Sequence, residues 1–562
     1  MSDTWQGPGY WLASDGKWYS PELHPDASEP VGASSAGPLE ARRMDTPMSA
    51  APWDSSPSPS WGRSLTATLP QPVDRFGPDA DAFVVGPVGA GRRRRVSRRA
   101  LGWGSGVLVA LTVTAGILVA LSGQSPKWDP RVLGIVHFDE QHRGLTFKTP
   151  VKVEFLSNAQ FNKQVSVPEP TSKADRAAQS RALGELRALG LVHGNVNLAA
   201  AENKLSQSDI VGLYVDTKKT VFVRGTALTP YVKVTLAHEL THALQDQYFN
   251  LTKLRQGVKN GDDTALTALI EGDAVRDENL YEQSLSASDQ QAYQKEQGQL
   301  DKGANQTSNV PEILSDMLEF PYAFGPTFVD SLDANGGTAA IDRAFRDPPV
   351  SEAQIADPVE YPIGWRPTRV APPTLRTGER RVDKPSSFGQ VSLFEVLGSR
   401  LGYDQAWHAV QGWQGDNSLP YKDQGRTCMA IDVAMSSLQT ATSLTEAARG
   451  WSQAIPGATV TQHAKLVDVR SCDPGPNAPG PPTITPSAFD VLSARAGIID
   501  DIMTSDQVDF ALGTCVVDKI LVGVGPSHYE DLISNSLSAT QETQLRQLAE
   551  SSATNCRAEG IN

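Results

Sequence analysis

The stretch that decides the fold of this chain is residues 229–250, which read TPYVKVTLAHELTHALQDQYFN. Thr229 is a favourable N-cap residue and Pro230 suits the first position of a helix, so we predict that a helix begins here. Leu236, Leu240 and the apolar residues that follow them indicate that this helix packs against the protein core.

The same stretch contains the pattern His-Glu-Leu-Thr-His at positions 238–242. Residues four apart lie on one face of a helix, so His238 and His242 can direct two imidazoles at one ion, with Glu239 beside them. A catalytic zinc takes three protein ligands and leaves one position for water. The pattern therefore predicts a Zn²⁺ site with two ligands on this helix and a third elsewhere.

The third ligand is predicted on a second helix. No histidine follows at the short spacing of the HExxHxxGxxH pattern, because Gln245 and Tyr248 occupy those positions. Residues 262–274, DDTALTALIEGDA, instead place a carboxylate within an apolar helical run. A charged Glu271 is costly to bury there unless it is paired or bound to a metal, so it is the predicted ligand, with Asp273 as the alternative.

This set of residues predicts metal-assisted hydrolysis. Zinc lowers the pKa of its bound water toward neutrality and polarises the scissile carbonyl, while Glu239 takes the proton and later delivers it to the leaving amine. The developing oxyanion also needs a hydrogen-bond donor. Four residues are candidates for that role: Tyr322, Tyr361, His408 and Arg224.

Strands and helices both surround the motif, so the predicted fold class is α+β. Residues 151–155 alternate as a strand does, and residues 171–190 have helical periodicity. Two short apolar runs, 211–215 and 221–224, flank a polar turn and predict a β hairpin.

The two helical segments resemble the gluzincin metallopeptidases, in which two helices supply His, His and Glu, over about residues 205–290. The resemblance implies a gluzincin-like core, which is a small mixed sheet with an active-site helix and a glutamate helix. In gluzincins a peptide commonly docks along an edge strand before the active-site helix. The hairpin at 211–224 is placed to do this by strand addition.

More closely, residues 238–247 and 268–274 are similar to an uncharacterised group of bacterial membrane-anchored proteins that look like metallopeptidases. Three later segments also recur in that group: PYAFG at 321–325, PPVSEAQ at 348–354 and GWQGD at 412–416. They extend the resemblance to about residue 430. One departure is Val275, where thermolysin-like members place an Asp that orients a ligating His; Asp273 and Asp277 are the alternatives here.

A basic cluster precedes a long uncharged segment. Arginines at 92–95, 98 and 99 run directly into residues 101–121, and no charged residue occurs between Arg99 and Lys127. Roughly 20 residues of helix cross the hydrocarbon core, so we predict one transmembrane helix. The positive-inside rule keeps the N-terminus cytoplasmic. The predicted location is the cell membrane, single-pass, with an extracytoplasmic catalytic domain.

All four cysteines, Cys428, Cys472, Cys515 and Cys556, lie in the last quarter of the chain and lack the CxxC spacing of a zinc ribbon. Disulfides are therefore predicted, and they require export from the reducing cytosol. Of the three possible pairings, the local one joins the first two and the last two cysteines without crossing. The other two pairings stay open at this stage.

Shifts in composition divide the chain into six predicted segments. The first is rich in Pro, Ser and Gly without apolar periodicity, except where aromatic pairs flank an Asp-Gly turn. The segments are a cytoplasmic disordered region (1–91) with a short aromatic hairpin motif at 8–19, a basic flank with the transmembrane helix (92–124), a zinc metallopeptidase-like domain (130–425), a small disulfide-closed α+β unit (426–473), a Pro-rich linker (474–486) and a helical C-terminal unit (487–562).

The formal net charge of -14 argues against a general nucleic-acid binder, because phosphate recognition needs Lys and Arg concentrated on one face. The expected partners are a polypeptide substrate and the membrane. A competing hypothesis is a catalytically inactive metalloprotease-like scaffold or binding protein of the cell envelope. A fourth protein ligand would favour that hypothesis, whereas an open metal position would favour catalysis.

Overall fold

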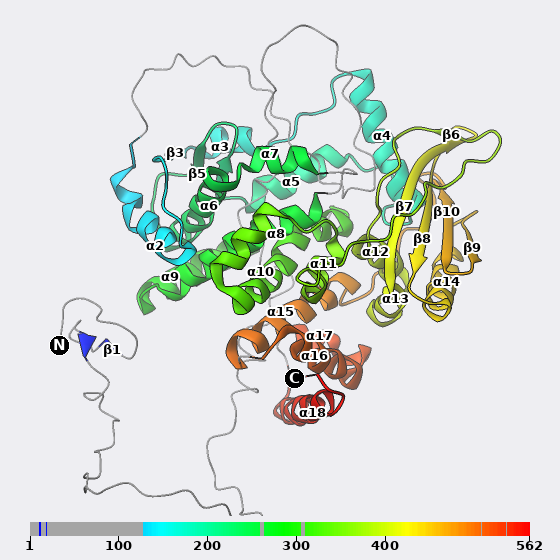
Figure 1. Ribbon diagram of the computed structural model, residues 1–562. Helices are drawn as coiled ribbons and strands as arrows, with labels where there is room; N and C mark the ends of the chain where they lie inside the picture. The colour runs from blue at the N-terminus through cyan, green and yellow to red at the C-terminus, as the bar shows by residue number, and fades with distance from the viewer. Residues whose placement is uncertain are drawn as a thin grey trace, which may run out of the picture. The chain divides into compact units, whose positions relative to one another are not determined.

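The computed structural model describes residues 11–12, 18–19, 127–258, 263–304, 310–506, 508–534 and 537–561 (Figure 1). The chain divides into two units, Met1–Ser58 and Pro59–Asn562. In the first, β1 (Trp11–Leu12) and β2 (Trp18–Tyr19) pair antiparallel, so the predicted aromatic hairpin is present. The predicted basic flank and transmembrane helix (92–124) lie outside the described residues, as does the rest of the segment predicted to be disordered.

In the second unit, a three-stranded sheet supports the helix that carries the His-Glu-Leu-Thr-His pattern. β3 (Lys152–Leu156) pairs parallel with β5 (Thr220–Arg224), and β4 (Gly212–Val215) pairs antiparallel with the other side of β5. The predicted strand and hairpin are thus confirmed. Helix α6 (Pro230–Phe249) packs on β4 and β5, and it begins where the sequence predicted.

Further helices occur between residues 130 and 360. They are η3 (Pro130–Val132), α2 (Leu133–Arg143), α3 (Asn158–Val165), α4 (Lys173–Ala188), α5 (Leu198–Asp209), α7 (Leu251–Gly257), α8 (Thr264–Gln283), α9 (Ala287–Ala304), α10 (Glu312–Arg346), α11 (Glu352–Ala356) and η4 (Pro358–Glu360). Helix α8 packs against α6 and, along much of its length, against α10 (green in Figure 1). The backbone of α10 departs from helical geometry at Gly336 and Gly337.

A five-stranded antiparallel sheet lies later in the chain, in the order β6-β7-β8-β10-β9. Its strands are β6 (Arg380–Arg381), β7 (Trp413–Asp423), β8 (Arg426–Met435), β9 (Thr459–His463) and β10 (Leu466–Cys472). Helices α12 (Gln390–Leu401), α13 (Tyr403–Val410) and α14 (Leu438–Ser452) accompany it. Strands β7 and β8 pair across the predicted boundary between residues 425 and 426, so this sheet draws on both predicted segments.

The C-terminal part is helical, as predicted, over the described residues. Residues 474–486 contain neither helix nor strand. They lead into α15 (Ala488–Asp506), α16 (Phe510–Val524), η5 (Pro526–His528), α17 (Tyr529–Ile533) and α18 (Ala539–Ala558). Within the described residues no single helix is long and apolar enough to cross a membrane; α16 and the segment Pro526–Ile533 pass that test only together, across a 90° bend.

Two disulfides close the later segments. Cys428 in β8 is bonded to Cys472 in β10, where the two residues lie directly opposite each other. Cys515 in α16 is bonded to Cys556 in α18. The local pairing is therefore the one that the fold adopts.

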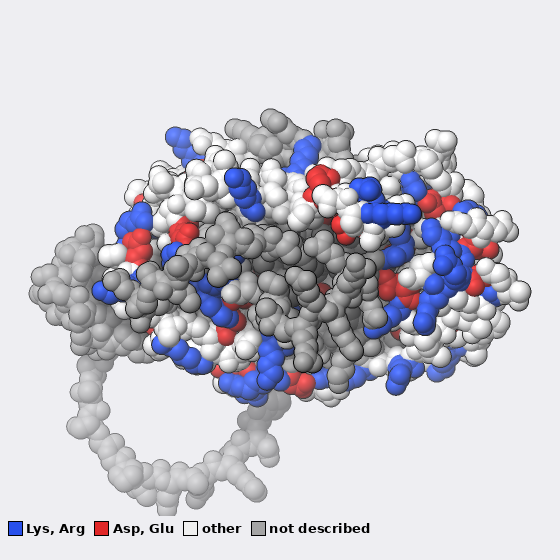
Figure 2. All heavy atoms as spheres, turned by 90° about the horizontal axis from the view of Figure 1, so that it is seen from above, with Lys and Arg blue, Asp and Glu red and all other residues white. Residues whose placement is uncertain are grey.

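The two largest hydrophobic cores of this unit lie next to each other, because α6 packs against α8. One is formed by α6 with β4, β5 and α2. The other runs from α4 and α8 through α10, α12 and the five-stranded sheet to the C-terminal helices. On the face drawn in Figure 2, described Lys and Arg side chains stand among Asp and Glu rather than in one continuous basic stripe.

The helices and sheets described above together give a mixed α+β fold, as predicted.

Candidate metal centre

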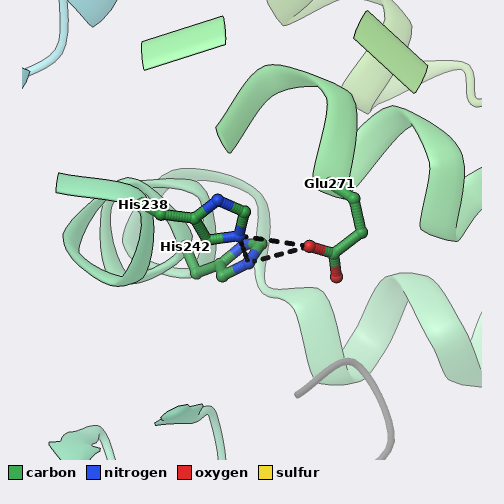
Figure 3. Close-up of side chains that lie close together, drawn as sticks. All are labelled: His238, His242 and Glu271. Atoms are coloured by element: carbon green, nitrogen blue, oxygen red, sulfur yellow. Dashed lines mark hydrogen bonds and ion pairs between the residues drawn. The ribbon is translucent and has the colours of Figure 1, made fainter. Parts of the chain in front are cut away.

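The three predicted ligands lie where the two hydrophobic cores meet. The side chain of Thr229 caps α6 by accepting from the backbone N–H of Val232, at 3.2 Å. Further along α6, His238 and His242 project from one face, and Glu271 reaches toward them from α8 (Figure 3). Because α6 is buried over most of its length, its polar face is shielded from water.

The distances among the three ligand atoms suit one metal ion. His238 Nε2 lies 2.8 Å from His242 Nε2 and 3.3 Å from Glu271 Oε2. The remaining separation, from His242 Nε2 to the same carboxylate oxygen, is 3.2 Å. Ligands bound at zinc distances in a tetrahedral site are about 3.3 Å apart. The three atoms therefore outline one face of such a tetrahedron.

The outer nitrogens of both imidazoles have acceptors as partners. His238 Nδ1 lies 2.9 Å from Glu278 Oε2, and His242 Nδ1 lies 3.0 Å from Gln245 Oε1. A carboxylate and an amide oxygen only accept, so each Nδ1 carries the proton and donates it. In a neutral imidazole the other nitrogen then holds a lone pair. Both Nε2 atoms therefore present lone pairs to each other and to Glu271.

The orientation of Gln245 is itself determined by its neighbours. Its amide nitrogen donates to the carbonyl of Ile270 and to Asp273 Oδ2, both at 2.9 Å, so its oxygen must face His242. Asp273 also accepts from Arg143, a guanidinium that is only 1% exposed. Asp273 thus acts on His242 through Gln245 rather than as a ligand.

Three electron-pair donors within 3.3 Å repel one another unless a cation lies between them. Burial by itself would raise the pKa of Glu271, whereas positive charge at His242 and His238 would lower it to about 2. With both imidazoles neutral, a bound divalent cation would supply that positive charge and keep the carboxyl group ionised. Two neutral imidazoles and one carboxylate are a donor set for a divalent metal, and the residues present fit Zn²⁺.

A close approach of two helices places Glu271. A Cβ at Gly272 would lie 2.2 Å from the backbone carbon and oxygen of Gly325, and a Cβ at Gly325 would lie 2.3 Å from the carbonyl oxygen of Ala268. Only glycine at both positions lets α8 and α10 touch here. The contact holds Glu271 next to Gly272, and it brings Tyr322 of α10 to the same region.

Glu239 is buried beside the ligands, and its carboxylate is bonded to the sheet. The backbone N–H of Tyr214 in β4 donates to Glu239 Oε2 at 2.6 Å. A Cβ at Gly212 would lie 2.9 Å from Glu239 Cγ, so glycine leaves the room for this contact. The residues of β4 are buried, so the predicted strand addition requires β4 to be uncovered first.

Of the four candidate oxyanion donors, Tyr322 is the one placed against the ligands, with its ring centroid 6.5 Å from that of His238. The hydroxyl of Tyr361 donates instead to a backbone carbonyl of the segment after α10. Arg224 donates to the end of α5 and to α3. His408 lies on α13, which packs on α12, α14 and α15.

Asp139 of α2 and Asp277 of α8 are two further buried acidic residues. Burial, reinforced by the charge of Asp277, raises the pKa of Asp139 well above its usual value. Burial also raises the pKa of Asp277, to about 7. Asp277 Oδ2 lies 3.0 Å from the hydroxyl of Thr241 rather than beside a histidine. Asp277 is therefore not the residue that orients a ligating imidazole.

Sequence reasoning missed the residues that orient the ligands. Glu278 lies seven residues after Glu271, which is two helical turns along the same face of α8, and that spacing could have revealed it. Gln245 lies one turn beyond His242 and could have been found in the same way. Arg143 is far away in sequence, and no local pattern links it to this site.

Two of the later recurring segments, GWQGD and PPVSEAQ, each supply one carboxylate that accepts hydrogen bonds at the start of α12. Asp416 accepts from the backbone N–H groups of Phe388 and Gly389, at 2.7 and 2.8 Å. Glu352 accepts from the backbone N–H groups of Val391 and Ser392 in the first turn of α12, at 2.9 and 3.0 Å. Carboxylates stabilise a helix N-terminus, so both segments support the fold rather than the metal centre.

Comparison of the chain with protein-family models, with curated proteins and with solved structures gave no match in any of the three.

Proposed function

We propose that this chain is a membrane-anchored, zinc-dependent endopeptidase of the gluzincin type that acts outside the cytoplasm. One observation carries the proposal. His238 and His242 turn their unprotonated nitrogens toward the carboxylate of Glu271, while their protonated nitrogens are held by Glu278 and Gln245. Three electron-pair donors that face one position in this way suit a bound cation.

The number of ligands supports a catalytic centre over a structural one. Among the described residues, His238, His242 and Glu271 form the group of potential ligands within 4.8 Å of one another, and no fourth His, Cys, Asp or Glu joins it. Structural zinc sites are closed by four protein ligands, whereas catalytic sites keep one position open. Two imidazoles and one carboxylate also suit Fe(II), so metal analysis must accompany any assay.

The neighbouring residues suit hydrolysis of an amide bond. A bound zinc ion would lower the pKa of a water ligand and polarise a carbonyl oxygen. Glu239, adjacent to His238 in sequence, is placed to take a proton from the attacking water and return it to the leaving nitrogen. To Tyr322, whose ring lies 6.5 Å from that of His238, we assign the hydrogen bond to the oxygen on which negative charge develops.

The membrane topology rests on the sequence, and the disulfides support it. Residues 101–121 are uncharged and follow six arginines, a pattern that places the chain after about residue 125 outside. Disulfides between Cys428 and Cys472 and between Cys515 and Cys556 are stable in that oxidising compartment.

The test combines metal analysis with an unbiased peptide library, using the purified full-length chain and its Glu239→Gln variant. We expect one zinc per chain in both proteins and cleavage by the wild type alone. Glu446→Gln, an exposed residue of α14, removes the same charge far from the ligands in sequence and should cleave normally. Equal cleavage by wild type and Glu239→Gln would rule out the enzymatic function. A loaded but inactive wild type would favour the scaffold hypothesis.

A further inference from the structure

A cavity of 520 Å³ lies between the N-terminal end of α10, helix α12 and the segment that leads into α15; Figure 1 labels these helices. None of the proposed metal ligands lines it. Apolar side chains form part of its wall, among them Leu191, Ile313 and Phe489. Its volume is that of a site for a small molecule or a single long side chain.

Three carboxyl groups stand among the polar side chains of the wall, which also include His193, Ser399 and Ser487. Glu312 is exposed at the start of α10, Asp316 follows one turn further along the same face, and Glu395 projects from α12. Burial and the mutual repulsion of these groups raise the pKa of both Asp316 and Glu395 well above the usual values. Carboxyl groups are therefore concentrated in a partly apolar hollow, where burial opposes their ionisation unless a cation lies beside them.

Glu395 is the residue that lacks a structural explanation. It is only 9% exposed, it lines the cavity, and its Oε1 has no hydrogen-bond partner. Its acidic neighbours differ, because Asp490 and Glu352 each accept from backbone N–H groups at a helix N-terminus. Within the described residues, no Lys, Arg or His forms an ion pair with Glu395, Asp316 or Glu312. A buried carboxylate in this position lacks a counter-charge that a ligand can supply.

Among the described residues, the carboxyl groups of this cavity do not form a site for a bare metal ion. In the described part of the chain, the group of three metal-ligating side chains within 4.8 Å is the one on α6 and α8, so the carboxylates of this cavity are too dispersed to chelate. We propose that the cavity binds a primary ammonium group on a short aliphatic chain. The ammonium lies between Glu395 and Asp316, and the chain lies against the apolar wall. This proposal does not depend on the metal centre.

Two sources offer that chemistry, a free small amine and the lysine side chain of a polypeptide. Isothermal titration of the purified full-length chain with n-butylamine and with the capped peptide acetyl-Gly-Lys-Gly-amide separates them. The matched neutral probes are n-butanol and the same peptide with norleucine. We expect at least one cationic probe to bind at least tenfold more tightly than its neutral counterpart, since a buried charge pair is worth more than about 1.4 kcal/mol.

Glu395→Gln preserves the shape of the side chain and should abolish that preference. Because it removes an ionisable group that burial and its acidic neighbours disfavour, it should leave the thermal midpoint of the ligand-free protein unchanged or raised, so that lost binding cannot be ascribed to unfolding. Glu446→Gln on α14 removes an exposed carboxylate and should bind as the wild type does. Binding by the lysine peptide alone identifies a polypeptide ligand, and binding by butylamine as well identifies a small amine. Equal binding of cationic and neutral probes, no binding of either, or normal binding by Glu395→Gln would overturn the proposal.

Discussion

Gly272→Ala tests how the metal centre is assembled. The added Cβ would lie 2.2 Å from the backbone of Gly325, whereas ordinary contact begins at 3.4 Å. Helices α8 and α10 must therefore separate locally by about 1.2 Å, because backbone atoms cannot yield as a flexible side chain does. Glu271 is the adjacent residue and moves with α8. Metal bonds tolerate only about 0.2 Å of displacement, so the carboxylate leaves bonding distance.

We expect Gly272→Ala to lower zinc affinity at least tenfold, measured by competition with a chromophoric chelator. The overpacking should also destabilise the protein by about 1–3 kcal/mol in urea unfolding. Gly298→Ala is the matched control, because no atom lies within 4 Å of a Cβ at that position of α9. The control should bind zinc normally and gain up to about 1 kcal/mol of helix stability. Wild-type zinc affinity and stability in Gly272→Ala would refute the reasoning.

Three further outcomes follow from the same contacts. Glu278→Ala removes the acceptor of His238 Nδ1 and should weaken zinc binding by about 10- to 100-fold in the chelator assay; unchanged affinity would contradict its role. The pKa of Asp277 in the folded protein, about 7, lies above that of an unfolded Asp, so folding takes up a proton and stability falls as pH rises from about 4 toward 7. Asp277→Asn should flatten that fall in urea unfolding, and an equally steep curve would count against it. Replacing Cys515 and Cys556 with Ser opens a loop with a separation of 41 residues and should lower stability by up to about 4 kcal/mol; a loss below about 1 kcal/mol would show that the bond constrains little.

Local signals in the sequence were sufficient for the elements that hold the ligands. Thr229 and Pro230 located the start of α6, and the spacing of His238 and His242 placed both rings on one face. Glu271 was identified because a charge within an apolar run needs a partner. Each inference used residues within a few helical turns, where geometry follows directly from the backbone.

Contacts between distant segments could not be predicted in this way. The approach of Gly272 to Gly325 depends on how α8 and α10 pack, and a lone glycine in a helical pattern does not indicate which residue will lie against it. Strand β7 was missed for a local reason. It contains Gly415, next to an irregularity in the pairing, and Pro420, and both residues are typical of loops or strand edges.

The burial of the metal centre sets a condition on hydrolysis. His238, Glu239 and Glu271 are all 0% exposed, and the N–H of Tyr214 on β4 donates to one oxygen, Oε2, of the Glu239 carboxylate. A hydrogen bond to a charged acceptor contributes about 1.5–3 kcal/mol, so this contact holds the closed arrangement. An extended peptide that pairs with β4 needs the same kind of N–H donor. If the chain is the peptidase proposed here, movement of β4 away from α6 would therefore open the site, free Glu239 to accept a proton and expose a backbone donor for the substrate in a single step.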